Sequence, residues 1–131
     1  MRSRHLSREI AESPREVYEF ASNPANLPAW AAGLAAGDIV QEGEALLVES
    51  PMGQVRVVFV PDNDLGVLDH DVTLPSGQTV TNHFRVLSHP HGAEVVFTVR
   101  QLDLTDEDFE RDCARVEADL DQLKGLLEST F

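Results

Sequence analysis

The stretch LDHDV, residues 68–72, places a histidine between two aspartates, and such a trio could bind a metal ion or act as an acid and a base. Either chemistry requires the three side chains to point into one space. The stretch is typical of a β-strand, in which successive side chains point to opposite faces. His70 then faces one way, whereas Asp69 and Asp71 face the other. We therefore expect no metal site that joins His70 to either aspartate.

The turn of residues 75–77 predicts how this strand pairs with the next one. Its sequence is Pro-Ser-Gly, and the glycine can supply the positive φ that a three-residue hairpin turn needs. On this register His70 lies opposite Asn82. Asp69 falls opposite His83 on the outer face, where we expect a solvated ion pair.

The next turn, HPHG at residues 89–92, would set Phe97 opposite Phe84 on the inner face. His70 and Asn82 are then polar exceptions on an apolar inner surface. One interpretation is that they hydrogen-bond each other or a backbone group, as buried polar groups usually do. The other is that they orient a ligand, because an apolar pocket with a few fixed polar groups is the usual small-molecule site.

Four further residues could carry chemistry. Cys113 is the only cysteine, and on the apolar face of the final helix we expect it to be a core residue with an unreactive thiol. Trp30 could line the mouth of a cavity or fill the core, and both interpretations stay open. His89 and His91 lie in a turn without an evident third ligand, so the sequence predicts no metal site there.

Composition excludes several classes of function. The 131 residues carry a formal net charge of -13, which disfavours electrostatic binding to nucleic acid or to an anionic membrane. The hydrophobic share of 42% is enough for the core of one domain spanning residues 1–131. The lone cysteine fits a reducing compartment, and the sequence has no apolar leader and no stretch of membrane-spanning length. We expect a soluble cytoplasmic protein without a cofactor.

Capping signals and apolar periodicity predict an α+β fold. Ser13 begins a short helix that ends at Asn23, before a proline, and a second helical turn carries Trp30. Thr105 caps a long final helix. The apolar stripe of that helix comprises Phe109, Cys113, Val116, Leu120, Leu123 and Leu127. Strands are expected at about 4–11, 38–41, 45–50, 54–60, 66–74, 79–87 and 93–102.

This order of elements, one strand, two short helices, six strands and a long helix, resembles the helix-grip fold of the START-like (SRPBCC, polyketide-cyclase-like) superfamily. The similarity spans the chain, and its most specific parts are the opening IAESPREVYEFASNPANLPAW and the closing DEDFERDCARVEADLDQLKGLLE. The stretch LGVLDHDVTLPSG is similar to small bacterial members without an assigned activity. The resemblance implies a curved antiparallel sheet wrapped around the C-terminal helix, with a cavity between them in which members hold lipids, sterols, polyketides or hormones.

The sequence and the resemblance together favour a protein that binds or carries a small apolar molecule. The expected ligand contacts are Trp30, His70, Asn82, Phe84, Phe97 and Cys113. The alternative is an enzyme of the cyclase or hydratase kind with His70 as general base. Cyclases of this family can use a cation in the cavity, but Arg56, Arg85 and Arg100 all fall on the outward phase of their strands. The sequence leaves a homodimer open.

Overall fold

A computed structural model describes residues 1–32, 34–35 and 37–129 of the chain. Seven strands form one antiparallel sheet in the order β1-β7-β6-β5-β4-β3-β2. The strands are β1 (Ser3–Ile10), β2 (Ile39–Glu42), β3 (Ala45–Ser50), β4 (Gly53–Phe59), β5 (His70–Thr73), β6 (Thr79–His89) and β7 (Gly92–Arg100).

The helical segments are two short helices, a 3₁₀ turn and a long helix, of which the first and the last begin at the predicted caps Ser13 and Thr105. They are α1 (Pro14–Ser22), the 3₁₀ turn η1 (Pro24–Asn26), α2 (Leu27–Trp30) and α3 (Asp106–Glu128). The Ser13 hydroxyl accepts a hydrogen bond from the Glu16 backbone N–H, and the Thr105 hydroxyl accepts one from Asp108 at 3.1 Å. Both bonds satisfy N–H groups that the first turn of a helix leaves free.

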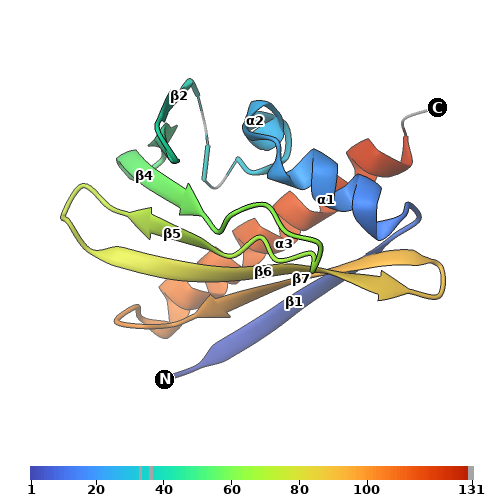
Figure 1. Cartoon of the computed structure of the whole chain (residues 1–131). Helices are drawn as coiled ribbons and strands as arrows, with labels where there is room; N and C mark the ends of the chain where they lie inside the picture. Colours follow the sequence, from blue (N-terminus) through green and yellow to red (C-terminus); the bar gives the residue numbers. More distant parts are fainter. Residues whose placement is uncertain (33, 36, 130–131) are drawn as a thin grey trace.

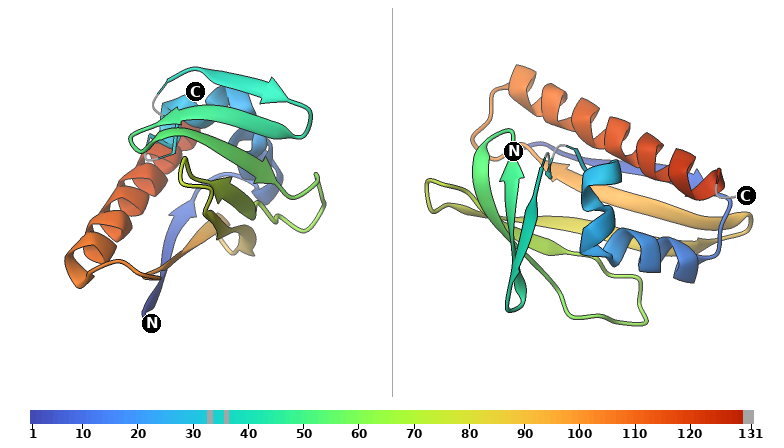
Figure 2. Two further views of the ribbon diagram at one scale, coloured as in Figure 1. Left: turned by 90° about the vertical axis from the view of Figure 1, so that its left-hand side faces the viewer. Right: turned by 90° about the horizontal axis from the view of Figure 1, so that it is seen from above.

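The sheet is bent around one side of α3, as the helix-grip description requires. Figure 1 shows α3 behind the sheet, with α1 and α2 beside it. In the right-hand view of Figure 2, β3 and β4 run across the direction of β6 and β7, so the sheet is strongly twisted. The helix α3 packs chiefly against β1, β7 and α2. The inner faces of β4, β5 and β6 therefore lie beyond its main contact.

The apolar stripe of α3 supplies the centre of the core. Phe109, Leu120 and Leu123 are fully buried, whereas Gln122 on the far side of the helix is exposed. Burial of apolar surface is the main favourable contribution to folding, so this contact fixes the helix on the sheet. Among the described residues, none of the helices combines the length and the apolar character that a membrane crossing requires.

The predicted register between β5 and β6 is confirmed. His70 pairs with Asn82 across the hairpin, and Phe84 pairs with Phe97 across the next one. Gly77 has φ +91°, the left-handed conformation that the turn needs.

The predicted strand at 66–74 is wrong in length, because β5 comprises only four residues. Asn63 holds the preceding loop through its side chain, which accepts from the Val67 backbone N–H at 3.1 Å and donates to the Val67 carbonyl at 2.9 Å. The contact with β6 nevertheless continues, since the Leu68 N–H donates to the Phe84 carbonyl. The loop thus departs from β4 while it still follows β6.

Candidate functional site

A polar pair lies in the middle of the inner face of the sheet. Phe59 on β4, His70 on β5 and Asn82 on β6 stand side by side in the ladder. His70 is 5% exposed, and Phe59 and Asn82 are half-buried. This row comes from three neighbouring strands whose inner faces α3 covers less than it covers β1 and β7.

The hydrogen bonds of His70 define its tautomer. Its Nδ1 lies 2.9 Å from the Leu68 carbonyl oxygen, which can only accept, so Nδ1 carries the proton. Its Nε2 lies 3.4 Å from the Asn82 amide nitrogen and accepts a long hydrogen bond from it. Burial lowers the pKa of His70. The imidazole is therefore neutral, with its one basic nitrogen toward Asn82.

Aromatic rings extend from His70 across the interior. The ring centroids are 4.7 Å apart between Phe59 and His70 and 6.1 Å apart between His70 and Phe97. They are 5.5 Å apart between Phe97 and Phe84 and 5.7 Å apart between Phe84 and Trp30. These are ordinary distances for tilted aromatic pairs, so the five rings form one packed cluster. Four of the expected ligand contacts lie in this cluster, and Asn82 joins it through His70.

Trp30 lies at the end of the cluster, and its indole N–H has no acceptor. The residue is 6% exposed and contacts Phe84, so its ring fills the core beside α2. Within the part of the chain that the structure describes, Trp30 Nε1 is the one buried side-chain nitrogen or oxygen without a hydrogen-bond partner. Such groups are rare in folded proteins because an unmade hydrogen bond is costly.

Cys113 is the one expected contact that lies outside the aromatic cluster, although it belongs to the same buried core. It lies on the buried face of α3, and burial raises the pKa of its thiol. In the described chain it shares no hydrogen bond or ring contact with the other five residues. A protonated, buried thiol has little nucleophilic character, which fits the expected core role.

Two hollows are present on the described surface, and the six expected contacts line neither of them. One has a volume of about 390 Å³ and lies between η1–α2 and β2–β3. It is lined by Pro24, Ala25, Pro28, Gly37, Asp38, Ile39, Gln41 and Leu46. The other is polar and lies between α1 and the loop after β4. Trp30, His70, Phe84 and Phe97 instead pack against one another in the aromatic cluster.

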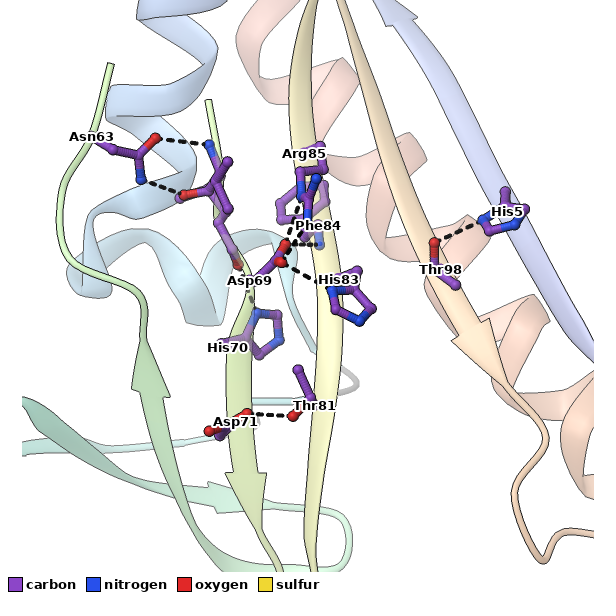
Figure 3. A network of polar contacts seen from close by, with 12 residues as sticks. His5, Asn63, Asp69, His70, Asp71, Thr81, His83, Phe84, Arg85 and Thr98 are labelled. Atoms are coloured by element: carbon purple, nitrogen blue, oxygen red, sulfur yellow. Dashed lines mark hydrogen bonds and ion pairs between the residues drawn. The ribbon is translucent and has the colours of Figure 1, made fainter. Parts of the chain in front are cut away.

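The outer face carries a second polar cluster, around Asp69. Its carboxylate accepts hydrogen bonds from Arg85 Nε and Nη2 at 2.9 and 2.7 Å, from the Phe84 backbone N–H at 3.0 Å and from His83 Nδ1 at 2.9 Å. Figure 3 shows these groups converging on the carboxylate between β5 and β6. The hydrogen bonds from Arg85 are the main reason that the pKa of Asp69 lies well below its ordinary value.

The expected solvated pair of Asp69 with His83 is therefore corrected in two respects. The pairing exists, but Asp69 is only 9% exposed, and Arg85 is its principal partner. The register alone identifies the residue directly opposite, whereas the long arginine side chain reaches Asp69 from two positions further along β6.

Two arginines that were not among the expected site residues lie on the inner face. Arg4 and Arg8 share the inward phase of β1 with the buried Leu6 and Ile10. Arg4 pairs with Glu110 and Arg8 with Asp121, both on α3. The alternation of arginine and apolar residues in RSRHLSREI was the available signal, but it resembles the pattern of a solvated strand. Both guanidinium groups therefore form ion pairs with carboxylates of α3.

Comparison with known proteins identifies the fold. Neither a protein-family model nor a curated protein matches the chain. Among solved structures, the Aha1 dimer of Colwellia psychrerythraea superposes with a TM-score of 0.79 at 16% identity and covers 98% of each chain. XoxI of Bacillus cereus gives a TM-score of 0.75 at 15% identity, covering 98% of this chain and 97% of its own. CV1439 of Chromobacterium violaceum gives 0.70 at 13% identity, covering 98% of this chain and 99% of its own.

Proposed function

We propose that the protein binds a small, uncharged apolar molecule with one or two polar groups between the sheet and α3. The proposed contacts are Trp30, His70, Asn82, Phe84, Phe97 and Cys113. The resemblance of the chain to the START-like superfamily supports this function, because members hold apolar molecules in that position. The net charge of -13 disfavours an anionic ligand.

The unpaired indole N–H of Trp30 is the observation that carries this proposal. A buried donor without an acceptor costs about 1–3 kcal/mol. A carbonyl or hydroxyl oxygen on a bound molecule would accept from Trp30 Nε1 and remove that cost. The polar groups of His70 and Asn82 lie further along the same aromatic cluster and would contact a second polar group.

Entry of a ligand requires side chains to move, because the aromatic cluster is packed. The ligand would enter through the hollow between α2 and β2–β3, since Pro28 on the wall of this hollow belongs to the same short helix as Trp30. Its volume of about 390 Å³ is within the range of small-molecule sites. A ligand that displaces the Trp30 ring from this side would reach the cluster without opening the contact between α3 and β1.

Intrinsic fluorescence provides a direct test, because Trp30 is the only tryptophan of the chain. A medium-chain methyl ketone, which offers one acceptor on an apolar chain, is titrated into the protein. The alkene of matched length serves as the probe without an acceptor. We expect a saturable change in emission with the ketone and weaker binding of the alkene. Native mass spectrometry of the isolated protein should also reveal a co-purifying apolar compound.

Substitutions on β5 and β6 separate a ligand contact from a general loss of stability. Asn82→Ala and His70→Ala should each weaken ketone binding by about 1–3 kcal/mol, because a hydrogen bond in a dry site is lost. Thr81→Ala is the matched control, since Thr81 is exposed on the opposite face and bonds Asp71. Equal affinities in all three variants, or no binding of ketone by the parent protein, would contradict the proposal.

An enzyme with His70 as general base is the second candidate, and one observation favours it. General-base catalysis needs a partner that orients the imidazole, and the Leu68 carbonyl is such a partner. Asn82 then remains as a donor for a developing negative charge. In this case His70→Gln would abolish turnover of a bound polyketide-like substrate while binding persists. Binding of such a substrate by the parent protein without turnover would favour the binding protein.

A homodimer is also proposed, on the support of one neighbour and one edge of the sheet. The Aha1 protein of Colwellia psychrerythraea was determined as a dimer. In the present chain β2 is an edge strand, and Val40 on it is 57% exposed. Unpaired strand edges are templates for association. Light scattering after size exclusion should give twice the chain mass, and Val40→Lys should return the monomer; a monomeric parent protein would exclude the dimer.

A further inference from the structure

The turn between β6 and β7 is held against the end of β1. His89 pairs with Gly92 across this turn, and Gly92 has φ +134°. A Cβ atom at Gly92 would lie 2.6 Å from the Ile10 carbonyl oxygen and 2.7 Å from that of Glu12. Only glycine allows so close an approach. The turn is therefore fixed beside the last residues of β1.

This contact brings two histidines to a glutamate that is eighty residues away in the sequence. Glu9 lies on the outer face of β1, and its Oε1 is 3.2 Å from His91 Nδ1 and 3.5 Å from His89 Nδ1. The three residues can each offer one ligand atom, and all three atoms lie within 4.8 Å of one another. Tetrahedral zinc with ligands at about 2.0–2.1 Å separates its ligand atoms by about 3.3 Å. Two of the separations are already close to this value.

The local charge favours a cation at this position. Glu9 lies opposite Glu94 in the ladder between β1 and β7, and both point to the outer face. Like charges directly opposite each other are destabilising. Among the described residues, the ion pairs of the Glu9 carboxylate are with His89 and His91 alone. A divalent ion bound between the three residues would neutralise this carboxylate.

One hydrogen bond competes with a metal ion for His89. The His91 backbone N–H donates to His89 Nδ1 at 3.1 Å. The turn is exposed at Pro90 and His91, so this N–H can donate to water instead when Nδ1 binds a metal ion.

We propose that Glu9, His89 and His91 form a binding site for a divalent transition-metal ion such as Zn²⁺. Two imidazole nitrogens and one carboxylate oxygen suit zinc, nickel or copper rather than magnesium or calcium. A fourth coordination position remains for water. The site lies on the outer face of the sheet, opposite to His70, and is independent of the proposed small-molecule site.

Metal titration of the untagged protein tests the site. Zn²⁺ should bind at one ion per chain by calorimetry, and Glu9→Gln, His89→Ala and His91→Ala should each weaken binding by more than about tenfold. His5→Ala and His83→Ala are the matched controls, since these histidines also lie on the outer face but bond Thr98 and Asp69. Both controls should leave the zinc affinity unchanged. Absence of stoichiometric binding, or an undiminished affinity in Glu9→Gln, would overturn the three-ligand site.

Thermal unfolding gives a second readout that does not depend on the calorimetric stoichiometry. An ion bound by Glu9, His89 and His91 ties β1 to the β6–β7 turn, and a ligand of the folded state raises the unfolding temperature. Zn²⁺ should therefore raise the Tm of the parent protein, a chelator should reverse the rise, and Glu9→Gln should show a smaller rise at the same zinc concentration. An equal rise in Glu9→Gln would mean that zinc acts elsewhere and would refute the proposal.

Discussion

Arg85 and Asp69 form a bidentate ion pair on the outer face of the sheet, with Nε and Nη2 at 2.9 and 2.7 Å from the two carboxylate oxygens. The pair joins β6 to the segment that precedes β5. Such fork-to-fork pairs are stronger than single contacts because both oxygens are satisfied in one plane. The buried Phe84 N–H donates to the same carboxylate, so the side chain of Asp69 also satisfies a backbone donor of β6.

Replacing Asp69 by asparagine should destabilise the fold. The charge is lost and an amide group replaces one acceptor of Arg85, so we expect a decrease of about 1.5–3 kcal/mol in the free energy of unfolding. Urea denaturation measures this difference. Asp71→Asn is the control on the same strand face, because Asp71 is exposed and bonds only Thr81 in the described chain. Its effect should stay within about 0.5 kcal/mol. Similar losses in the two variants would contradict the assigned role of Asp69.

The carboxylate of Asp69 should also make the free energy of unfolding depend on pH in the acidic range. The pKa of Asp69 is lower in the folded chain than in the unfolded chain, chiefly because Arg85 bonds the charged form. Its contribution is therefore complete above the unfolded pKa of about 3.9 and is lost as pH falls below that value. Between about pH 5 and 2 the parent protein should lose more unfolding free energy than Asp69→Asn does. Parallel pH profiles would show that Asp69 contributes nothing in this range.

Glu110 should titrate at an unusually low pH. Hydrogen bonds from Arg4, at 2.6 and 2.7 Å, and from Arg2, at 2.9 Å, lower the pKa of this exposed carboxyl to about 2. Carbon-13 NMR of the glutamate carboxyls measures it directly. Arg4→Gln should raise the pKa of Glu110 more than Arg2→Gln, because Arg4 makes two of the three bonds. The reverse order would show that Arg2 is the main partner.

His70 should remain neutral and keep its proton on Nδ1. Burial lowers its pKa in the folded chain, so its contribution to stability is present above the unfolded pKa of about 6.5 and is lost as pH falls below it. Proton–nitrogen correlation spectra of the imidazoles at pH 7 should show the Nδ1–H tautomer for this residue. The Nε2–H tautomer would mean that the Leu68 carbonyl does not orient the ring.

Leu120 should be a major contributor to the core. It is fully buried on α3, and Leu120→Ala removes apolar contact and leaves a cavity, with an expected loss of about 2–5 kcal/mol. Gln122→Ala lies on the exposed face of the same helix and should change stability by less than about 0.5 kcal/mol. Chemical denaturation of the two variants compares a buried and an exposed position at equal helix content. A loss below about 1 kcal/mol for Leu120→Ala would place the helix contact elsewhere.

Local periodicity was sufficient for the order of elements and for the hairpin registers. The Pro-Ser-Gly turn determines that His70 pairs with Asn82, because a hairpin register follows from the length of its turn. Local periodicity does not predict contacts between segments that are far apart in the sequence. The position of Glu9 beside His89 and His91 depends on the pairing of the first and last strands, for which no connecting turn exists.

The strand alternation was sufficient to predict which aromatic side chains face inward, but not how they pack. Alternation along the strands places Phe84 and Phe97 on the inner face, as observed. This alternation does not predict how far Trp30, from the short helix α2, enters the space between these two rings and α3. Trp30 is buried against Phe84, and α2 packs against α3, a tertiary relationship that the pattern of α2 alone does not contain.

The ion pairs that join β1 to α3 have a consequence for the order in which the protein can fold. Arg4 and Glu110 are separated by 106 residues, and Arg8 and Asp121 by 113. During synthesis on the ribosome, β1 therefore emerges long before its ion-pair partners on α3 exist. Until then Leu6 and Ile10 are exposed on an unpaired strand, which is the state most open to misassociation. Pairing of β1 with β7 and packing of α3 against β1 thus end the period in which Leu6 and Ile10 are exposed.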